Sequence, residues 1–148
     1  MTLAILAETH SSTHMNDVPP ALRTWFVIHC VADVVIATPL MVAPQAFLGA
    51  LGWQAVDPYT ARIAAAALFG VGLESYLGRN QALPVFAHML NLKVIWSFAC
   101  VVGIAVSIAQ GAQGRPPMAY VFLATFVAFH GLWQYYRAVV GRRLSSQT

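Results

Sequence analysis

The sequence predicts an all-α integral membrane protein, built as an up-down-up-down bundle of four transmembrane helices. The first indication is composition: of 148 residues, 59% are hydrophobic and 9% are charged, whereas about a quarter of the residues in a soluble domain are charged. The second is a mean hydropathy of +0.66. The third is a series of four long apolar runs with turn sequences between them, because short connections make neighbouring helices antiparallel. The expected solvent is therefore lipid.

The segment before the first apolar run, residues 1–20, is expected to be a disordered tail. It begins with a short apolar stretch that lacks the basic residues of a signal peptide, and polar residues follow. Met15 is an alternative start codon, which would leave residues 1–14 untranslated.

The first predicted span covers residues 22–43, where Pro39 is expected to kink the helix or to end it early. At about 1.5 Å per residue this run can cross a hydrocarbon core of about 30 Å. The connection 44–57 carries several large apolar residues, so we expect a short amphipathic helix on the membrane surface with Trp53 at the level of the headgroups.

Capping residues mark the next two spans. Asp57 followed by Pro58 is typical of an N-cap and a first helical position, which opens a second span over residues 58–77. Asn80 is expected to cap a third span over residues 82–109, because its side chain can accept hydrogen bonds from the first helical N–H groups.

The remaining sequence predicts one further span. Residues 110–117 contain glycine and proline and turn the chain, and a fourth span covers residues 118–140. Residues 144–148 are expected to be a short tail. No internal repeat indicates a second domain, so residues 21–143 are predicted to form one four-helix transmembrane domain.

The distribution of arginines predicts the orientation in the membrane. Helix ends on one side carry five of them and helix ends on the other side carry two, and cytoplasmic loops are richer in basic residues. The five are Arg23, Arg79, Arg137, Arg142 and Arg143, and the two are Arg62 and Arg115. We therefore expect a multi-pass protein of the bacterial cytoplasmic (inner) membrane with both termini in the cytoplasm. The formal net charge of +3 comes from cations at helix ends rather than from a patch, which argues against nucleic acid as a partner.

Two ionisable residues lie near the middle of predicted spans, Asp33 in the first and Lys93 in the third. Charged groups inside a membrane are costly and normally face the interior of a bundle, so the two are predicted to pair. A structural ion pair would fix which helix packs against which. The alternative is a proton-coupled carrier with its substrate or proton site at this pair. His29 shares a helix face with Asp33 and could hydrogen-bond to it.

Three histidines and one glutamate are predicted at a similar depth in the cytoplasmic half, one on each span: His29, Glu74, His88 and His130. Such a set could bind a metal ion, as His and carboxylate ligands do in helical bundles. The alternative is a set of hydrogen-bonded groups without a ligand, since no single helix carries a paired ligand motif. For Glu74 the alternative is an interfacial carboxylate, because it lies close enough to the membrane boundary to meet Arg79 or water. Gln134 shares a helix face with His130 and is a further polar candidate.

Small residues at four-residue spacing predict close helix contacts. Ala66 and Gly70 form such a pair in the second span, and Ala99, Gly103 and Ser107 form a series in the third. The spacing leaves open whether these contacts lie within one chain or between subunits of a homo-oligomer.

Four segments carry a resemblance to a known group: GALGW, DPYTARIAAAALFGVGLESYLGRN, HMLNLKVIWS and GLWQYYR. In pattern and length the chain resembles small four-span bacterial inner-membrane proteins of uncharacterised function, loosely similar to the DoxX-like class, over residues 22–142. The resemblance implies a four-helix inner-membrane bundle and carries no catalytic residues. Some DoxX-like proteins are tied to quinone-linked redox chemistry, but this sequence contains no aligned cofactor motif.

Motifs for phosphate binding, nucleophilic catalysis or Cys-based metal binding are absent from the sequence, so an enzyme is not the leading interpretation. We expect a non-enzymatic membrane protein that binds a lipid or a small hydrophobic ligand, or that acts as an accessory subunit of a larger membrane complex. The sequence requires no cofactor. The alternatives are the carrier that uses Asp33 and Lys93, and a redox protein that holds haem, a metal ion or quinone through its histidines.

Overall fold

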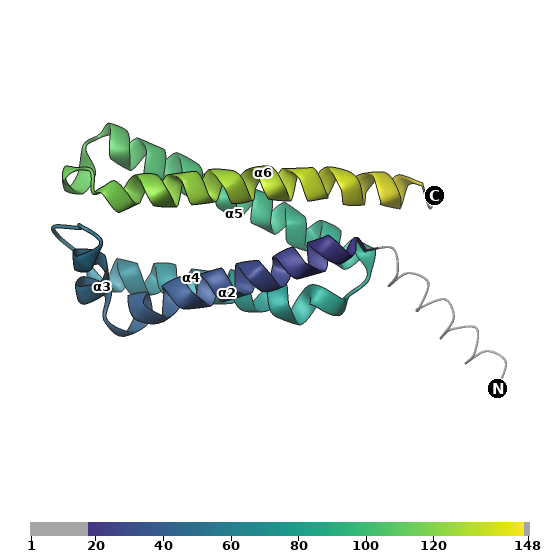
Figure 1. Cartoon of the computed structure of the whole chain (residues 1–148), viewed down its shortest axis with the longest axis horizontal. Helices are drawn as coiled ribbons and strands as arrows, with labels where there is room; N and C mark the ends of the chain where they lie inside the picture. Colours follow the sequence, from purple (N-terminus) through teal and green to yellow (C-terminus); the bar gives the residue numbers. More distant parts are fainter. Residues whose placement is uncertain (1–17, 147–148) are drawn as a thin grey trace.

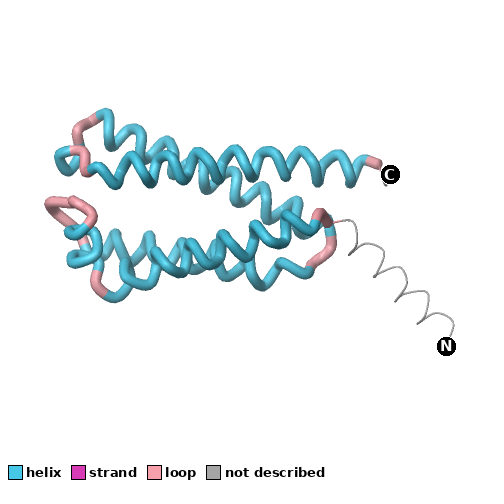
Figure 2. Tube along the Cα trace, in the orientation of Figure 1, coloured by secondary structure: helices cyan, strands magenta, loops and turns pink. Residues whose placement is uncertain are grey.

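The computed structural model describes residues 18–146, and all regular secondary structure in that range is helical (Figures 1 and 2). The predicted all-α class is therefore confirmed. The four long helices are α2 (Pro20–Val42), α4 (Pro58–Leu77), α5 (Leu83–Ala109) and α6 (Pro117–Ser145). The short elements are α3 (Pro44–Ala50) and the 3-10 turns η1 (Gly78–Asn80) and η2 (Ala112–Gly114). Residues 1–17 of the predicted disordered tail (residues 1–20) lie outside the described part of the chain.

Proline marks the start of each helix named above. Pro20, Pro44, Pro58 and Pro117 are the first residues of α2, α3, α4 and α6, and Pro84 is the second residue of α5. Proline suits this position because the first N–H groups of a helix have no partner within it and the fixed φ angle is already helical. The prolines explain why the helix starts could be placed closely from the sequence.

The cap predicted at the start of α4 is confirmed. The Asp57 carboxylate accepts hydrogen bonds from the backbone N–H groups of Tyr59 and Thr60, at 3.2 and 3.0 Å, and from the hydroxyl of Thr60. These hydrogen bonds stabilise the charged form of the exposed carboxyl and hold its pKa below the ordinary value of 3.8. The bond from the Thr60 hydroxyl contributes most, followed by those from the backbone N–H groups of Thr60 and Tyr59.

Two further predictions about helix ends are wrong, those for Asn80 and for residues 144–145. Asn80 lies in η1, and the residue before α5 is Ala82, which makes no side-chain capping bond. Helix α2 (Pro20–Val42) agrees with the predicted span 22–43, and Pro39 lies inside it without ending it early. Helix α6 extends to Ser145, so residues 144 and 145 are not a tail. Arg142 and Arg143 lie in its last turn, where positive charge is favourable next to the helix dipole.

The helices pack as two pairs, α2 with α4 and α5 with α6 (Figure 1). We call the end where α2 begins and α6 ends the terminal end, and the opposite end, with α3 and η2, the loop end. At the terminal end, side chains from α2, α5 and α6 form the larger hydrophobic core. Its fully buried members include Leu22, Phe26, Phe86, Leu90, Trp133 and Val140.

A second, smaller core lies between α2 and α4 towards the loop end. Its buried residues are Ala37, Leu40, Ala61 and Ala65, and Phe47 of α3 packs against them. The connection 44–57 therefore begins with a short helix, as the sequence predicted, and this helix covers the small core.

The two loops at the loop end contact each other. The backbone N–H of Ala55 donates to Oε1 of Gln113 at 2.8 Å, and the rings of Trp53 and Phe122 lie 5.9 Å apart. Gly52 adopts a φ angle of +98°, which a residue with a Cβ rarely does, and this turn brings Trp53 towards α6.

The outer surface of the long helices is apolar. Large side chains on α2, α4 and α5 are strongly exposed, for example Val42 (73%), Ile63 (71%) and Ile95 (67%). Among the described helices, α2 and α5 are long and apolar enough to cross a membrane, and only 28% and 17% of their most apolar segments are buried inside the protein. The apolar character of these helices is therefore not explained by packing within the chain.

Candidate functional site, a buried polar cluster

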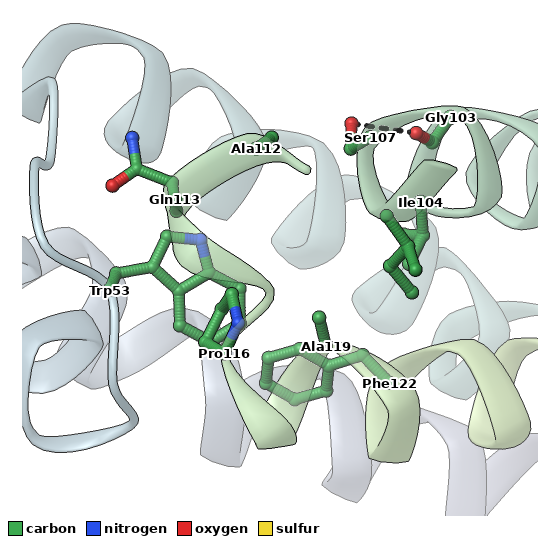
Figure 3. Close-up of a pocket in the computed structure, with 10 residues that line it drawn as sticks. Trp53, Gly103, Ile104, Ser107, Ala112, Gln113, Pro116, Ala119 and Phe122 are labelled. Carbon is green, nitrogen blue, oxygen red and sulfur yellow. Dashed lines mark hydrogen bonds between the residues drawn. The ribbon is translucent and has the colours of Figure 1, made fainter. Parts of the chain in front are cut away.

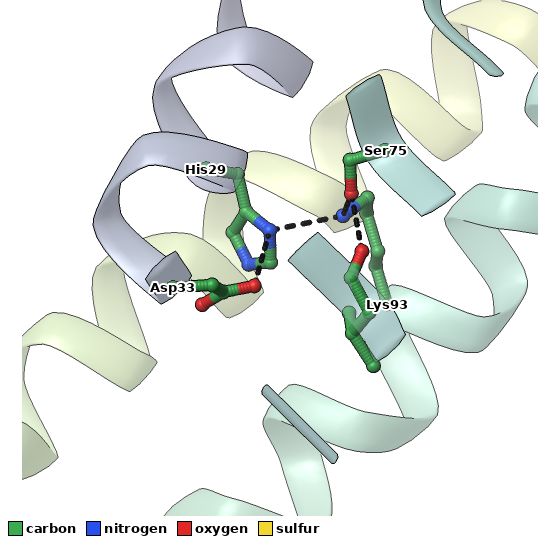
Figure 4. Close-up of polar contacts among 5 residues, drawn as sticks. His29, Asp33, Ser75 and Lys93 are labelled. Carbon is green, nitrogen blue, oxygen red and sulfur yellow. Dashed lines mark hydrogen bonds and ion pairs between the residues drawn. The ribbon is translucent and has the colours of Figure 1, made fainter. Parts of the chain in front are cut away.

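The main polar cluster consists of His29 and Asp33 from α2, Ser75 from α4 and Lys93 from α5 (Figure 4). All four are buried, with exposed fractions from 0% for Ser75 to 9% for Asp33. The cluster therefore joins both helix pairs through polar side chains inside a protein whose outer surface is apolar.

Lys93 is the centre of this cluster. Its ammonium donates to Oγ of Ser75 at 2.6 Å and lies 3.1 Å from Nδ1 of His29. The same Nζ lies 4.9 Å from the ring centroids of both Phe26 and Trp133. Hydrogen bonds and two aromatic faces thus replace the water that a buried ammonium loses, which is the condition for keeping such a charge inside.

Asp33 and Lys93 do not form the direct ion pair that the sequence suggested. Oδ2 of Asp33 instead lies 3.1 Å from Nδ1 of His29, so the imidazole stands between the two charged groups. This Oδ2 is buried, and its approach to His29 lacks the alignment of a hydrogen bond. The prediction that Asp33 and Lys93 lie at a similar depth agrees with their place in one cluster. The sequence did not show that the imidazole of His29 lies between them.

A glycine allows α2 and α4 to approach at Asp33. A Cβ atom on Gly72 would lie 2.7 Å from Cβ of Asp33 and 3.0 Å from its Oδ2, closer than such atoms pack. Gly72 therefore closes one side of the carboxyl group. Gly70 and Gly103, which the spacing singled out for close contacts, have no atom within 4 Å of a built Cβ.

A separate polar pair joins α5 to α6. Oγ of Ser97 lies 3.0 Å from Nδ1 of His130 and also donates to the carbonyl of Val94 at 3.2 Å. Ser97 is 2% exposed. The sequence did not predict that Ser75 and Ser97 make buried polar contacts with Lys93 and His130. One signal could have found Ser97: it lies four residues after Lys93 and so on the same helix face.

The four-ligand metal hypothesis is not supported by the geometry. His29 is buried in the cluster and His130 pairs with Ser97, while Glu74 and His88 are exposed. Within residues 18–146 no group of three or more His, Cys, Asp or Glu side chains could hold a metal ion. The reason is helix rotation: Ser75 and Met89 face inwards, and the preceding residue on a helix points about 100° away. Gln134, next to buried Trp133, is exposed for the same reason.

An apolar pocket of about 280 Å³ lies at the loop end between α5, η2, the start of α6 and Trp53 (Figure 3). Rings and aliphatic side chains form most of its wall, from Trp53, Phe122, Ile104 and Ile108. Gly103 and Ala119 are small residues of its lining, and Ser107 and Gln113 are polar ones. Its size is close to the lower limit of about 300 Å³ for small-molecule pockets.

Comparisons with protein-family models, with curated proteins and with solved structures found no match to this chain. The resemblance to DoxX-like proteins therefore stays a prediction.

Proposed function

We propose that this chain is a four-span, up-down-up-down integral protein of the bacterial cytoplasmic membrane, with both termini in the cytoplasm, which binds a lipid or a small hydrophobic molecule without chemical conversion. The observation that carries the proposal is the inverted polarity of the described helices. Asp33 in α2 and Lys93 in α5 are buried, while large apolar residues such as Val35, Ile63 and Ile95 are exposed. In lipid this arrangement is favourable, because the exterior matches acyl chains and the ionisable side chains face other polar groups inside.

The loop-end pocket is the proposed ligand site. Its wall is formed mainly by aromatic and aliphatic groups, and Ser107 and Gln113 are the polar residues of its lining. Such a lining suits an acyl chain or an apolar ring better than a charged molecule, since it offers almost nothing to replace water around a charge. No reacting group is needed for this function, and binding could equally serve a larger membrane complex in which the chain is an accessory subunit.

The membrane part of the proposal is tested by fractionation and by reporter fusions. We expect the protein to remain in the membrane pellet after alkaline carbonate extraction. A C-terminal fluorescent protein should fold and fluoresce, and a C-terminal alkaline phosphatase should be inactive. Release by carbonate, or an active phosphatase, would contradict membrane integration or the orientation respectively.

The ligand part is tested by native mass spectrometry of protein purified with bacterial phospholipid. Gly103→Phe should fill the pocket without a backbone clash, because nothing lies within 4 Å of a Cβ at this position. We expect at least a tenfold loss of retained phospholipid. Gly131→Phe is the matched control, since Gly131 is also an open helical glycine but does not line the pocket. Equal phospholipid retention by the two variants would overturn the assignment of the pocket.

A further inference from the structure

One nitrogen in the polar cluster has two partners and can serve only one of them at a time. Nδ1 of His29 lies 3.1 Å from Nζ of Lys93 and 3.1 Å from Oδ2 of Asp33. An imidazole nitrogen either carries a hydrogen and donates, or presents a lone pair and accepts. When it accepts from the ammonium of Lys93, Asp33 receives nothing from it, and Oδ2 is in fact buried without a hydrogen bond.

We propose that Nδ1 of His29 and Oδ2 of Asp33 together bind one exchangeable proton, and that binding of this proton releases Lys93 from His29. In the first state Lys93 donates to His29, whose own ring hydrogen is on Nε2, and Oδ2 of Asp33 has no donor. In the second state one proton lies between Oδ2 and Nδ1, on either atom, and satisfies both. Lys93 then keeps its hydrogen bond to Ser75 and its two aromatic faces.

The change between the states balances without a co-reactant. One proton is taken up from the surroundings, no bond between heavy atoms forms or breaks, and no group is oxidised. With an ionised lysine and aspartate, the net charge of the three residues rises from zero to +1.

Few other ionisable groups face this site from the surrounding helices. On α2 and α5 the thiols of Cys30 and Cys100 lie within electrostatic range of Asp33. On α6 the nearest neighbours of His29 are the rings of Phe129 and Trp133, and His130 belongs to the separate pair with Ser97. On α4, Gly72 and Ser75 do not ionise, and Glu74 is exposed. The proton is therefore assigned to His29 and Asp33 rather than to a wider network.

The test is nuclear magnetic resonance of the full chain in phosphatidylcholine nanodiscs, labelled with ¹⁵N-histidine and ¹³C-aspartate. His29→Gln and Asp33→Asn identify the signals of the two residues among five histidines and three aspartates. In the wild-type protein we expect the His29 nitrogens and the Asp33 carboxyl carbon to change with one common midpoint between about pH 5 and pH 8, the range in which histidines titrate. A structural role alone would leave both signals constant.

Two variants test where the proton binds and whether Lys93 competes with it for Nδ1 of His29. Asp33→Asn should abolish the His29 transition, and Lys93→Met should keep the proton between Oδ2 and Nδ1 at every pH in the range. His130→Gln is the control and should leave the midpoint unchanged, because His130 bonds to Ser97. Constant wild-type signals, different midpoints for His29 and Asp33, or a midpoint that moves with His130→Gln would each overturn the proposal. The wild-type titration decides even if a variant does not fold, and it does not depend on the loop-end ligand.

Discussion

Helices α5 and α6 are apolar at both the terminal end and the loop end of the molecule, but they are tightly packed only at the terminal end. At the terminal end Phe26, Phe86 and Trp133 from three helices are 0–1% exposed. In the part of α5 from residue 98 to 109 and the part of α6 from residue 120 to 132, no residue reaches the same level of burial. The same pair of helices thus forms a core in one half and the walls of an open pocket in the other.

The size of the facing residues explains this difference. Interlocking aromatic rings fill the terminal end, with Phe26 4.8 Å from Phe86 and 5.8 Å from Trp133 between ring centroids. The loop end presents Gly103 and Ala119 where bulky groups would be needed to close the space. Hydrophobicity alone therefore does not determine where a helical bundle is solid, because shape complementarity decides it. The polar cluster adjoins the solid half, where Lys93 contacts its aromatic rings.

Removing the largest side chain of the terminal end should have the largest effect on stability. Trp133→Ala should lower the free energy of unfolding by about 3–5 kcal/mol, as is typical for a buried tryptophan. The indole is 1% exposed and packs on Phe26, His29 and the Lys93 ammonium. Trp53→Ala at the loop end is the matched change and should cost clearly less, because Trp53 is only partly buried beside the pocket. Denaturation in mixed micelles, followed by circular dichroism, measures both, and equal losses would remove the contrast between the two ends.

The polar cluster should contribute less than the aromatic core, but measurably. Ser75→Ala removes a fully buried hydroxyl that accepts from Lys93 at 2.6 Å, so we expect a loss of about 1.5–3 kcal/mol, the usual range for a hydrogen bond to a charged group. Ser107→Ala is the control at the loop end, where an exposed hydroxyl donates to the carbonyl of Gly103 at 2.8 Å. That change should stay within about 0.5 kcal/mol. The same denaturation assay compares them, and a loss for Ser75→Ala as small as that for Ser107→Ala would show that the cluster does not hold the helices together.

The sequence was sufficient to predict where each helix lies along the chain, but not which of its residues face the interior. Proline starts and the Asp57 cap are local signals, and they placed α4 at residues 58–77 without error. Which residues face inwards depends instead on the contrast between an apolar and a polar face. Helices that are apolar on all sides provide little contrast, and for this reason the sequence did not show that Ser75, rather than its neighbour Glu74, faces the interior.

The sequence determines how deep a residue lies along its helix better than it determines which side chain lies next to that residue. Asp33 and Lys93 could be matched because depth follows from counting residues at about 1.5 Å each. The position of the His29 ring between them depends on side-chain packing against Phe129 and Trp133 of α6, residues about 100 positions later in the chain. Likewise the closure of the site by Gly72 depends on how closely α2 and α4 approach, which no local pattern encodes.

The smallest expected effect concerns one helix start at the loop end and its dependence on pH. The pKa of Asp57 is lower in the folded protein than its ordinary value of 3.8, so its carboxylate stabilises the start of α4 above that pH, and the contribution is lost as the pH falls through the folded-state value. We expect faster amide hydrogen exchange at Tyr59 and Thr60 in acid, relative to the intrinsic rate, in the wild-type protein. Asp57→Asn, whose amide oxygen can cap but whose side chain does not ionise, should remove this acid dependence.

The start of α6, at the same end of the molecule, is an internal control for that experiment. Its N-terminal neighbour is Pro116, which has no side-chain cap and nothing to titrate. Protection in the first turn of α6 should therefore not change with pH, whereas that of α4 should fall. A parallel loss in both helices would instead mean that the whole loop end opens in acid. In that case the two loops, which are joined by the contacts from Ala55 to Gln113 and from Trp53 to Phe122, would open together, and the Asp57 cap would have no separate effect.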